Sequence, residues 1–353
     1  MEEITTIGVD IAKNVFQLHG VNAEGKVVLR KALRRGQMQS FFEKLSPCLI
    51  GVEACATAHH WARTLIAVGH DVRLIPPNYI KPYLRRQKND AADAAAICEA
   101  VTRPSMRFVP VKSEDQQATL MLHSARELLI LQRTALINAL RGHFAELGIV
   151  APQGARNVRQ LIAILDDEPH SPQAVRIALA PLAAALVEIE RQIAKLDKAI
   201  LATHRNNDVS IRLATVPGIG PVIATCLAAS VSDAKLFKGG REFAAWLGLV
   251  PRQHSTGGKP RLGSISKMGN RHLRKLLVVG AHAALYRMKN GMADTPLANW
   301  ARCLLSKKPF KLVAVALANK IARIAWAIMA RNISYLPDPA ARDGAMVSAS
   351  ATA

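Results

Sequence analysis

The chain of 353 residues is too long for one ordinary hydrophobic core, so its length predicts two or three domains. Half of the residues are hydrophobic and only 5% are aromatic, which indicates the aliphatic, alanine-rich core typical of helical proteins. Lys and Arg outnumber Asp and Glu by 47 to 26, a formal net charge of +21, and this surplus favours a polyanionic partner, usually nucleic acid.

The charge is unevenly distributed. From residue 201 to the end, 22 Lys and Arg residues face 6 Asp and Glu residues, a net charge of +16, whereas residues 1–200 have a net charge of +5. If acids bind metal and bases bind phosphate, the two tasks belong to different parts of the chain.

The five cysteines have no Cys-x-x-Cys spacing and predict reduced, mostly buried thiols in a cytosolic protein. They are Cys48, Cys55, Cys98, Cys226 and Cys303. The N-terminus lacks a signal-peptide pattern, and Lys320 and Arg323 interrupt the apolar stretch 312–330. We therefore expect a soluble, cytoplasmic protein with no membrane span and no membrane partner.

The first part of the chain alternates β-like runs with turns and helical stretches. Strands are expected at 4–11, 15–21, 26–33, 48–52 and 72–75, and helices near 37–45 and at 59–68. Three strands in a meander, followed by strand–helix alternation, predict an α/β fold. The order fits an RNase H-like sheet, and other α/β folds share the pattern.

The middle of the chain is helical. Ser113, followed by Glu114 and Asp115, is a good helix start, and the helix should run to Leu147 and end at Gly148. A second long helix is predicted at 181–204, with apolar residues at a heptad spacing. These are Leu182, Leu186, Ile189, Ile193, Leu196 and Ile200. The spacing predicts a coiled-coil seam, either within one helical hairpin or between two copies of the chain.

The last part predicts short helices, glycine turns and basic residues, with helices near 270–289 and 309–329. Residues 336–353 are rich in Pro, Ala and Ser and are predicted to be disordered. The expected organisation is a domain at 1–112, a helical coiled-coil segment at 113–205, a mostly helical domain at 206–335 and a tail.

Four carboxylates stand out in the first part. Asp10 and Glu53 each follow an apolar run, and Asp90 and Asp93 are one helical turn apart in an alanine-rich stretch. Each alone is more often a cap or a solvated acid. Together, in a basic protein, they predict a shared divalent-metal site for phosphoryl transfer. The nearby 59–61 run, His-His-Trp, is interpreted as surface or wall rather than as metal ligands.

Two glycine-rich segments in the basic part are candidates for phosphate contact. Gly218 and Gly220 in the sequence VPGIGP precede an apolar helix at 222–229, a helix–hairpin–helix pattern that binds DNA phosphates without reading sequence. The alternative is a tight helix–helix corner.

The second segment places hydroxyls in an electropositive turn. Ser255, Thr256, Gly257 and Gly258 lie among basic residues that are expected to hold nucleic acid: Arg252, Lys259, Arg261, Lys267, Arg271 and Arg274. A serine attacks a phosphodiester only when it is activated and the phosphate charge is neutralised. The alternative is an ordinary turn serine.

The order of these motifs resembles one known family. The segments GVDIAK, VEACATAHHW, QKNDAADAAAI, VPGIG and GLVPRQHSTGGKPRLGSISKMGNRHLR are similar, over about residues 4–335, to the DEDD transposases of insertion sequences. These are relatives of the Piv DNA invertase and include recombinases guided by a bridge RNA encoded in the element. The histidine-tryptophan run and the STGGK turn look most like the subgroup whose elements carry short terminal inverted repeats.

The resemblance implies a RuvC-like (RNase H-like) N-terminal domain, a coiled-coil insertion and a C-terminal transposase domain. It assigns Asp10, Glu53, Asp90 and Asp93 as ligands of Mg²⁺ or Mn²⁺, and a serine as the nucleophile that forms a 5′-phosphoserine link. Many relatives have a Ser directly before the first Gly; here that position is Thr256, so we expect Ser255 to act, with Thr256 as the alternative.

The resemblance also implies binding partners, and two alternative functions stay open. The partners are DNA at the element ends and target, a noncoding guide RNA, and further copies of the chain in a dimer or tetramer in which the acids of one subunit meet the serine of another. A RuvC-like junction resolvase or nuclease would need the acids and water but no serine. A non-catalytic helix–hairpin–helix module would need neither the acids nor the serine.

Overall fold

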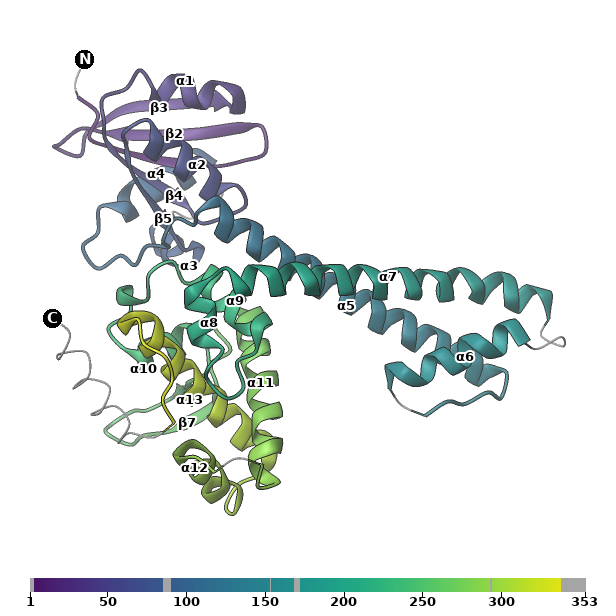
Figure 1. The fold of residues 1–353 in the computed structure, drawn as a ribbon. Coiled ribbons are helices and arrows are strands. Elements are labelled where there is room, and N and C mark those ends of the chain that lie inside the picture. Colours follow the sequence, from purple (N-terminus) through teal and green to yellow (C-terminus); the bar gives the residue numbers. More distant parts are fainter. Residues whose placement is uncertain (1–2, 85–89, 153, 168–171, 293, 338–353) are drawn as a thin grey trace. The chain divides into compact units, whose positions relative to one another are not determined.

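The computed structural model describes residues 3–84, 90–152, 154–167, 172–292 and 294–337 (Figure 1). The chain divides into two compact units, Met1–Glu114 and Asp115–Ala353. The expected further division at residue 205 stays a prediction. Most of the tail that was predicted to be disordered, from residue 338 onward, lies outside the described residues.

The first unit contains a five-stranded mixed sheet. Its strands are β1 (Thr6–Asp10), β2 (Val15–Val21), β3 (Val27–Arg34), β4 (Leu49–Glu53) and β5 (Asp71–Ile75), in the order β3-β2-β1-β4-β5. β1, β2 and β3 form an antiparallel meander, and β4 pairs in parallel with both β1 and β5. The predicted α/β fold of this region is confirmed, and each strand lies within a few residues of its predicted place.

Helices cover both faces of this sheet because side chains alternate between the faces of a strand. Ile7 and Val9 point into a core shared with α1 (Met38–Phe42) and α2 (Ala58–Ala67). The opposite face carries α4 (Asp90–Val101), which packs on β1 and β4. Three short helices complete the unit: η1 (Arg35–Gln37), α3 (Pro77–Ile80) and η2 (Lys81–Tyr83).

The second unit begins with three helices: α5 (Glu114–Glu146), α6 (Ala155–Asp167) and α7 (Gln173–Arg205). α5 and α7 run side by side as an arm, with α6 at its end (Figure 1). Leu140 of α5, Leu161 of α6 and Leu186 of α7 belong to one buried cluster, and Arg126 of α5 pairs with Asp197 of α7 at 2.5 Å. The arm is therefore a helical hairpin within one chain; a coiled coil between copies stays a prediction.

The predicted start of the second long helix was wrong. α7 begins at Gln173 and continues through Pro181, although proline is favoured at a helix start and removes a hydrogen bond from a helix interior. Leu179, nearly two turns into this extra segment, is buried against α5 and α6. Its packing offsets the missing hydrogen bond.

The rest of the second unit is a compact group of helices around α13 (Phe310–Arg331). The other elements are α8 (Asp208–Leu213), α9 (Pro221–Ser230), η3 (Ala234–Leu236), α10 (Gly240–Trp246), β6 (Pro251–Gln253), β7 (Leu262–Ile265), α11 (Arg271–Lys289) and α12 (Pro296–Leu305). Among the described residues, α13 alone is long and apolar enough to cross a membrane. Eight of its residues are buried in the core of this unit, as in the core helix of a globular protein.

Candidate functional site

Four acids gather at one edge of the sheet in the first unit. Val9 pairs with Val52 in the parallel β1–β4 ladder, so Asp10 and Glu53, the next residues, end neighbouring strands on the same side. Asp90 and Asp93 lie in the first turn of α4. One carboxylate oxygen from each of Asp10, Asp90 and Asp93 lies within 4.8 Å of the other two.

Two glycines position α4 above the strands. A Cβ atom at Gly8 would lie 2.1 Å from the carbonyl oxygen of Ala94, and one at Gly51 would lie 2.8 Å from the Cβ atom of Val101. Any larger residue would push the helix away from the sheet. These glycines therefore set the distance between the acids of α4 and those of the strands. Gly8 stands in the GVDIAK segment, but its role needs the three-dimensional register and was not predicted.

Glu53 joins the group through electrostatics. Burial raises the pKa of its carboxyl, the negative charge of Asp93 raises it further, and the Lys81 ammonium opposes both effects. The same acids affect the Cys55 thiol. Burial raises the pKa of this thiol most, and the negative charges of Glu53 and Asp10 raise it further. Lys81 and Cys55 are neighbours of the site that the sequence did not indicate.

The arrangement suits a divalent cation. Carboxylates this close repel one another, and each favours a proton or a cation between them. The Asp side chains at the strand end and at the helix start supply carboxylate oxygens, the ligands that hard ions such as Mg²⁺ and Mn²⁺ prefer. The negative groups also lie at the positive end of the α4 dipole, which reduces the cost of bringing them together.

The serine candidate lies on a β-hairpin in the second unit. The sequence predicted only a turn here; the structure extends it into the paired strands β6 and β7. Thr256 and Lys259 form a bridge around Gly257 and Gly258, whose φ values are 55° and 74°. Positive φ at both central residues is the type I′ hairpin turn, for which Gly-Gly is well suited.

Ser255 is oriented by this hairpin. Its Oγ accepts hydrogen bonds from the backbone N–H of Arg261 and from the side-chain amide of Gln253, both at 3.1 Å. Hydrogen bonds donated to an oxygen favour its negatively charged form. Ser255 is exposed, so its hydroxyl is accessible to a large substrate.

The basic residues around the hairpin differ in their exposure and in their hydrogen bonds to backbone carbonyl oxygens. Lys259, Arg261, Lys267 and Arg271 are exposed. Arg274 is committed to the fold, because its Nη1 donates to the carbonyl oxygens of Leu247 at 2.9 Å and Met268 at 2.8 Å. Arg252 makes one long bond, at 3.4 Å, to the carbonyl oxygen of Ser266. The first four are therefore better placed than Arg274 to bind an external phosphate.

The VPGIGP segment joins α8 to α9. Gly218 has a φ of 94°, and its carbonyl oxygen would lie 2.0 Å from a Cβ atom at Gly280 of α11. Close packing between two backbones therefore explains Gly218. Gly220 is exposed, with open space where a side chain would stand, at the N-cap of α9. Of the two glycines, Gly220 is the one whose backbone is accessible.

In the His-His-Trp run at 59–61, His59 and Trp61 contribute to the fold, and His60 lies at the surface. His59 Nδ1 accepts a hydrogen bond from the backbone N–H of Lys112 at 3.2 Å, and burial, then the charges of Lys112 and Arg63, lower its pKa to about 4. His60 is exposed and Trp61 is buried.

A basic cavity in the second unit was not predicted. It has a volume of about 1090 Å³ and is lined by Lys238, Arg241, Lys320 and Arg323 together with Trp300 and Trp326. The Lys320 ammonium lies 4.2 Å from the centre of the Trp300 ring. Trp300 lies on α12, a helix that the sequence pattern did not indicate.

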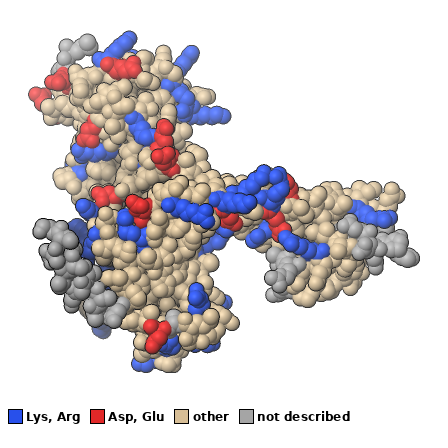
Figure 2. All heavy atoms as spheres, in the orientation of Figure 1, with Lys and Arg blue, Asp and Glu red and all other residues tan. Residues whose placement is uncertain are grey.

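Basic side chains also mark the arm. On the face shown in Figure 2, Lys and Arg residues gather along the middle of α5 and α7, beside a smaller number of acids. This band adds to the positive surface available to a polyanion.

Two family models match the chain. A DEDD transposase model of the IS110 type covers residues 7–149, and a model described as the transposase IS116/IS110/IS902 family covers residues 210–295. The first range contains the four acids and the second contains the VPGIGP segment and the β6–β7 hairpin.

Full-length relatives agree with these matches. The chain is 48% identical to a protein of Pseudomonas aeruginosa named as a probable family 20 transposase, over 95% of this chain and 99% of that protein. It is 38% identical to the transposase for insertion sequence element IS1328 of Yersinia enterocolitica, again over 95% and 99%. It is 23% identical to the pilin gene-inverting protein of Moraxella bovis, over 93% and 96%.

Proposed function

Because this chain belongs to the IS116/IS110/IS902 family of transposases, we propose that it cuts and rejoins DNA at defined sites through a metal-bound acidic site and a serine nucleophile. The observation that carries this proposal is the meeting of carboxylate oxygens from Asp10, Asp90 and Asp93 within 4.8 Å, with Glu53 beside Asp93.

The fold of the first unit supports the acidic half of the proposal. A meander of three antiparallel strands followed by two parallel strands, with acids at the ends of β1 and β4 and on α4, is the arrangement expected of an RNase H-like or RuvC-like domain. Asp10, Glu53, Asp90 and Asp93 would hold Mg²⁺ or Mn²⁺. When bound, such an ion neutralises charge on the phosphate that is being transferred.

Ser255 supplies the nucleophile. Its Oγ gives up its proton and attacks the phosphorus, the bond between phosphorus and the 3′ oxygen breaks, and the 3′ oxygen takes up a proton and leaves as a hydroxyl. The products are a 5′-phosphoserine link and a free 3′ end. In the reverse sense, a 3′-hydroxyl of another strand attacks the same phosphorus and releases Ser255. The two N–H donors on Oγ support Ser255 rather than Thr256 in this role.

Several surfaces of the second unit would bind the nucleic acid. The hairpin presents Lys259 and Arg261 next to the reacting phosphate. The exposed backbone at Gly220 opens a helix N-terminus that suits a phosphate. The cavity places basic side chains beside two tryptophans, a combination that also occurs in sites for single-stranded nucleic acid.

The active assembly is proposed to contain several copies of the chain and a guide RNA. Acids from one subunit would meet Ser255 of another in a dimer or tetramer, so that strands are exchanged only when both sites are occupied. The surplus of positive charge supports a second polyanion in addition to DNA. Sequencing the DNA beside the gene tests the RNA directly, since a guide requires an adjoining noncoding RNA.

The decisive assay for the reaction uses labelled element-end DNA, Mg²⁺ and the full-length chain. Wild type should form a covalent protein–DNA adduct that survives denaturation. Ser255→Ala should lose the adduct, and Thr256→Ala should keep it. The Ser255→Ala variant should still fold, because the hairpin is exposed and its turn is set by Gly257 and Gly258.

The other outcomes identify the rivals. Cut DNA without any adduct would mean a hydrolytic nuclease that uses water. Binding without cutting would mean a non-catalytic module. Loss of the adduct in Thr256→Ala with retention in Ser255→Ala would move the nucleophile by one residue.

A further inference from the structure

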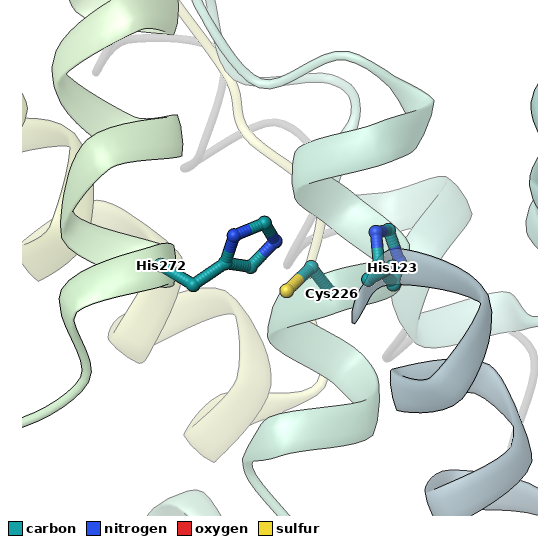
Figure 3. Close-up of side chains that lie close together, drawn as sticks. All are labelled: His123, Cys226 and His272. Atoms are coloured by element: carbon teal, nitrogen blue, oxygen red, sulfur yellow. The ribbon is translucent and has the colours of Figure 1, made fainter. Parts of the chain in front are cut away.

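A second cluster of ligating side chains lies inside the second unit, apart from the four acids. His123 comes from α5, Cys226 from α9 and His272 from α11, and one ligating atom of each lies within 4.8 Å of the others (Figure 3). In Figure 3 the ring of His272 and the thiol of Cys226 point toward one another, and His123 approaches from the other side. These residues are far apart in sequence, so no spacing motif marks them.

The hydrogen bonds around His123 leave one ring nitrogen unused. Thr225 donates its hydroxyl proton to the carbonyl oxygen of Pro221 at 2.8 Å. Its Oγ1 is therefore an acceptor toward His123 Nε2, which lies at 3.0 Å and carries the ring proton. The other nitrogen, Nδ1, is then unprotonated. It is buried in a residue only 2% exposed and has no hydrogen-bond partner among the described residues.

His272 has a similar arrangement. Its Nδ1 lies against the carboxylate of Glu127 in a short contact. Both ring nitrogens are buried, and within the described part of the chain neither makes a well-directed hydrogen bond. A carboxylate beside one nitrogen orients the ring and leaves the other nitrogen for a metal, as in carboxylate–histidine–zinc sites. Thr225 and Glu127 thus occupy the supporting positions that metal-bound histidines commonly have.

The charges nearby are already compensated. Lys275 is paired with Glu127 at 3.1 Å, and Arg126 is paired with Asp197 at 2.5 Å. The Cys226 side chain is buried, so the thiol is protected from other reactions. Buried nitrogen lone pairs without partners are costly in a core, and a cation is a direct way to satisfy them.

We propose that His123, Cys226 and His272 bind a zinc ion that links α5, α9 and α11. Zinc favours this mixture of nitrogen and sulfur ligands, and three protein ligands with water in the fourth place is a common set. Ligands of a tetrahedral zinc ion lie roughly 3.5 Å apart, so a side-chain movement of about 1 Å closes the observed group. The ion would fix the arm to the helix after Gly220 and to the helix after the Ser255 hairpin.

The test uses full-length protein in which Asp10→Asn has weakened metal binding at the acidic site. Mass spectrometry of the purified protein should find about one zinc ion per chain. After replacement of zinc by Co²⁺, the thiolate–cobalt absorption band should appear. Cys226→Ser should remove the band, and Cys55→Ser and Cys303→Ser should keep it. The Cys55 control is needed because that thiol lies near the acids.

Three further variants keep the test decisive if Cys226→Ser folds poorly. His123→Asn should lose the metal, whereas His143→Asn, an exposed histidine on the same helix, should retain it. Thr225→Val, which keeps the shape of the side chain but removes the acceptor for His123, should weaken zinc binding about 10–100-fold. Absence of zinc and of the cobalt band in the Asp10→Asn protein, or a band that survives Cys226→Ser, would overturn the proposal.

Discussion

Asp10 and Asp93 occupy elements with buried interiors, whereas Ser255 lies on a hairpin in which every residue from Pro251 to Ser264 is exposed. The acids are placed by nonlocal packing, above all the approach of α4 to Gly8. The hydroxyl is placed by a two-glycine turn and two hydrogen bonds. One half of the proposed site therefore depends on the core, and the other half depends on local backbone geometry.

The largest effect should come from removing charge at the acidic site. Asp10→Asn should slow strand exchange by about 10³-fold or more, because a metal ligand contributes several kcal/mol to stabilising charge in the transition state. Binding of DNA, measured by gel shift, should stay nearly unchanged because the basic surface is intact. Asp71→Asn, which changes an exposed acid on strand β5 of the same sheet, is the control. Equal losses of binding and activity in Asp10→Asn would contradict this assignment.

Packing beneath the acids gives the next effect. Gly8→Ala should destabilise the first unit by about 1–3 kcal/mol, because the new Cβ atom overlaps the Ala94 carbonyl. Hydrogen exchange of peptides from β1 and α4 in the full chain should reveal the loss, together with reduced DNA cleavage. Gly36→Ala, where a Cβ atom meets open space, should change little. Similar protection in both variants would mean that α4 does not rest on Gly8.

The basic residues of the second unit should separate into two classes. Lys259→Ala and Arg261→Ala should each reduce the slope of DNA affinity against salt by about one, because each loses a phosphate contact. Arg274→Ala should leave that slope unchanged and instead lower Tm, because two carbonyl oxygens lose their donor. A slope change in Arg274→Ala equal to that of the other two would remove the distinction.

The smallest effect concerns acid stability of the first unit. The pKa of His59 is lowered from 6.5 to about 4, so between these values the unfolded chain binds more protons than the folded chain. Stability should therefore fall as pH drops from 6.5 toward 4. His59→Asn, which keeps an acceptor for the Lys112 N–H, should show a smaller drop in Tm over this range. His60→Asn should follow wild type; identical pH profiles for all three would exclude His59 as a source.

Local patterns were enough for much of the first unit. Alternating apolar runs placed the strands that end at Asp10 and Glu53, and the alanine-rich turn placed Asp90 and Asp93 on one helix. The contact between that helix and Gly8 depends on a register between segments about 85 residues apart, which no local pattern encodes. Lys81 and Cys55 likewise became visible as neighbours of the acids only in three dimensions.

In the second unit, local sequence patterns did not predict two strands, the start of α7 or a cluster of ligating side chains. All residues of β6 and β7 are exposed except Ile265, which is half-buried, so the two strands lack the apolar alternation that marks a strand. The second long helix was predicted to start at residue 181, but α7 starts at Gln173, and Leu179 in the added segment is buried in the cluster shared with α5 and α6. The cluster of His123, Cys226 and His272 joins three helices whose spacing in the chain carries no signal.

Mn²⁺ binding, followed by electron paramagnetic resonance on the full-length chain, tests whether the acids at the strand ends and those on α4 form one metal site. Wild type should bind the ion, and Asp10→Asn and Asp93→Asn should each weaken binding by more than about tenfold, because affinity follows the number of charged oxygen ligands. Asp71→Asn should bind as wild type does. Unchanged affinity in the Asp10 and Asp93 variants would contradict a metal site shared by the strand ends and α4.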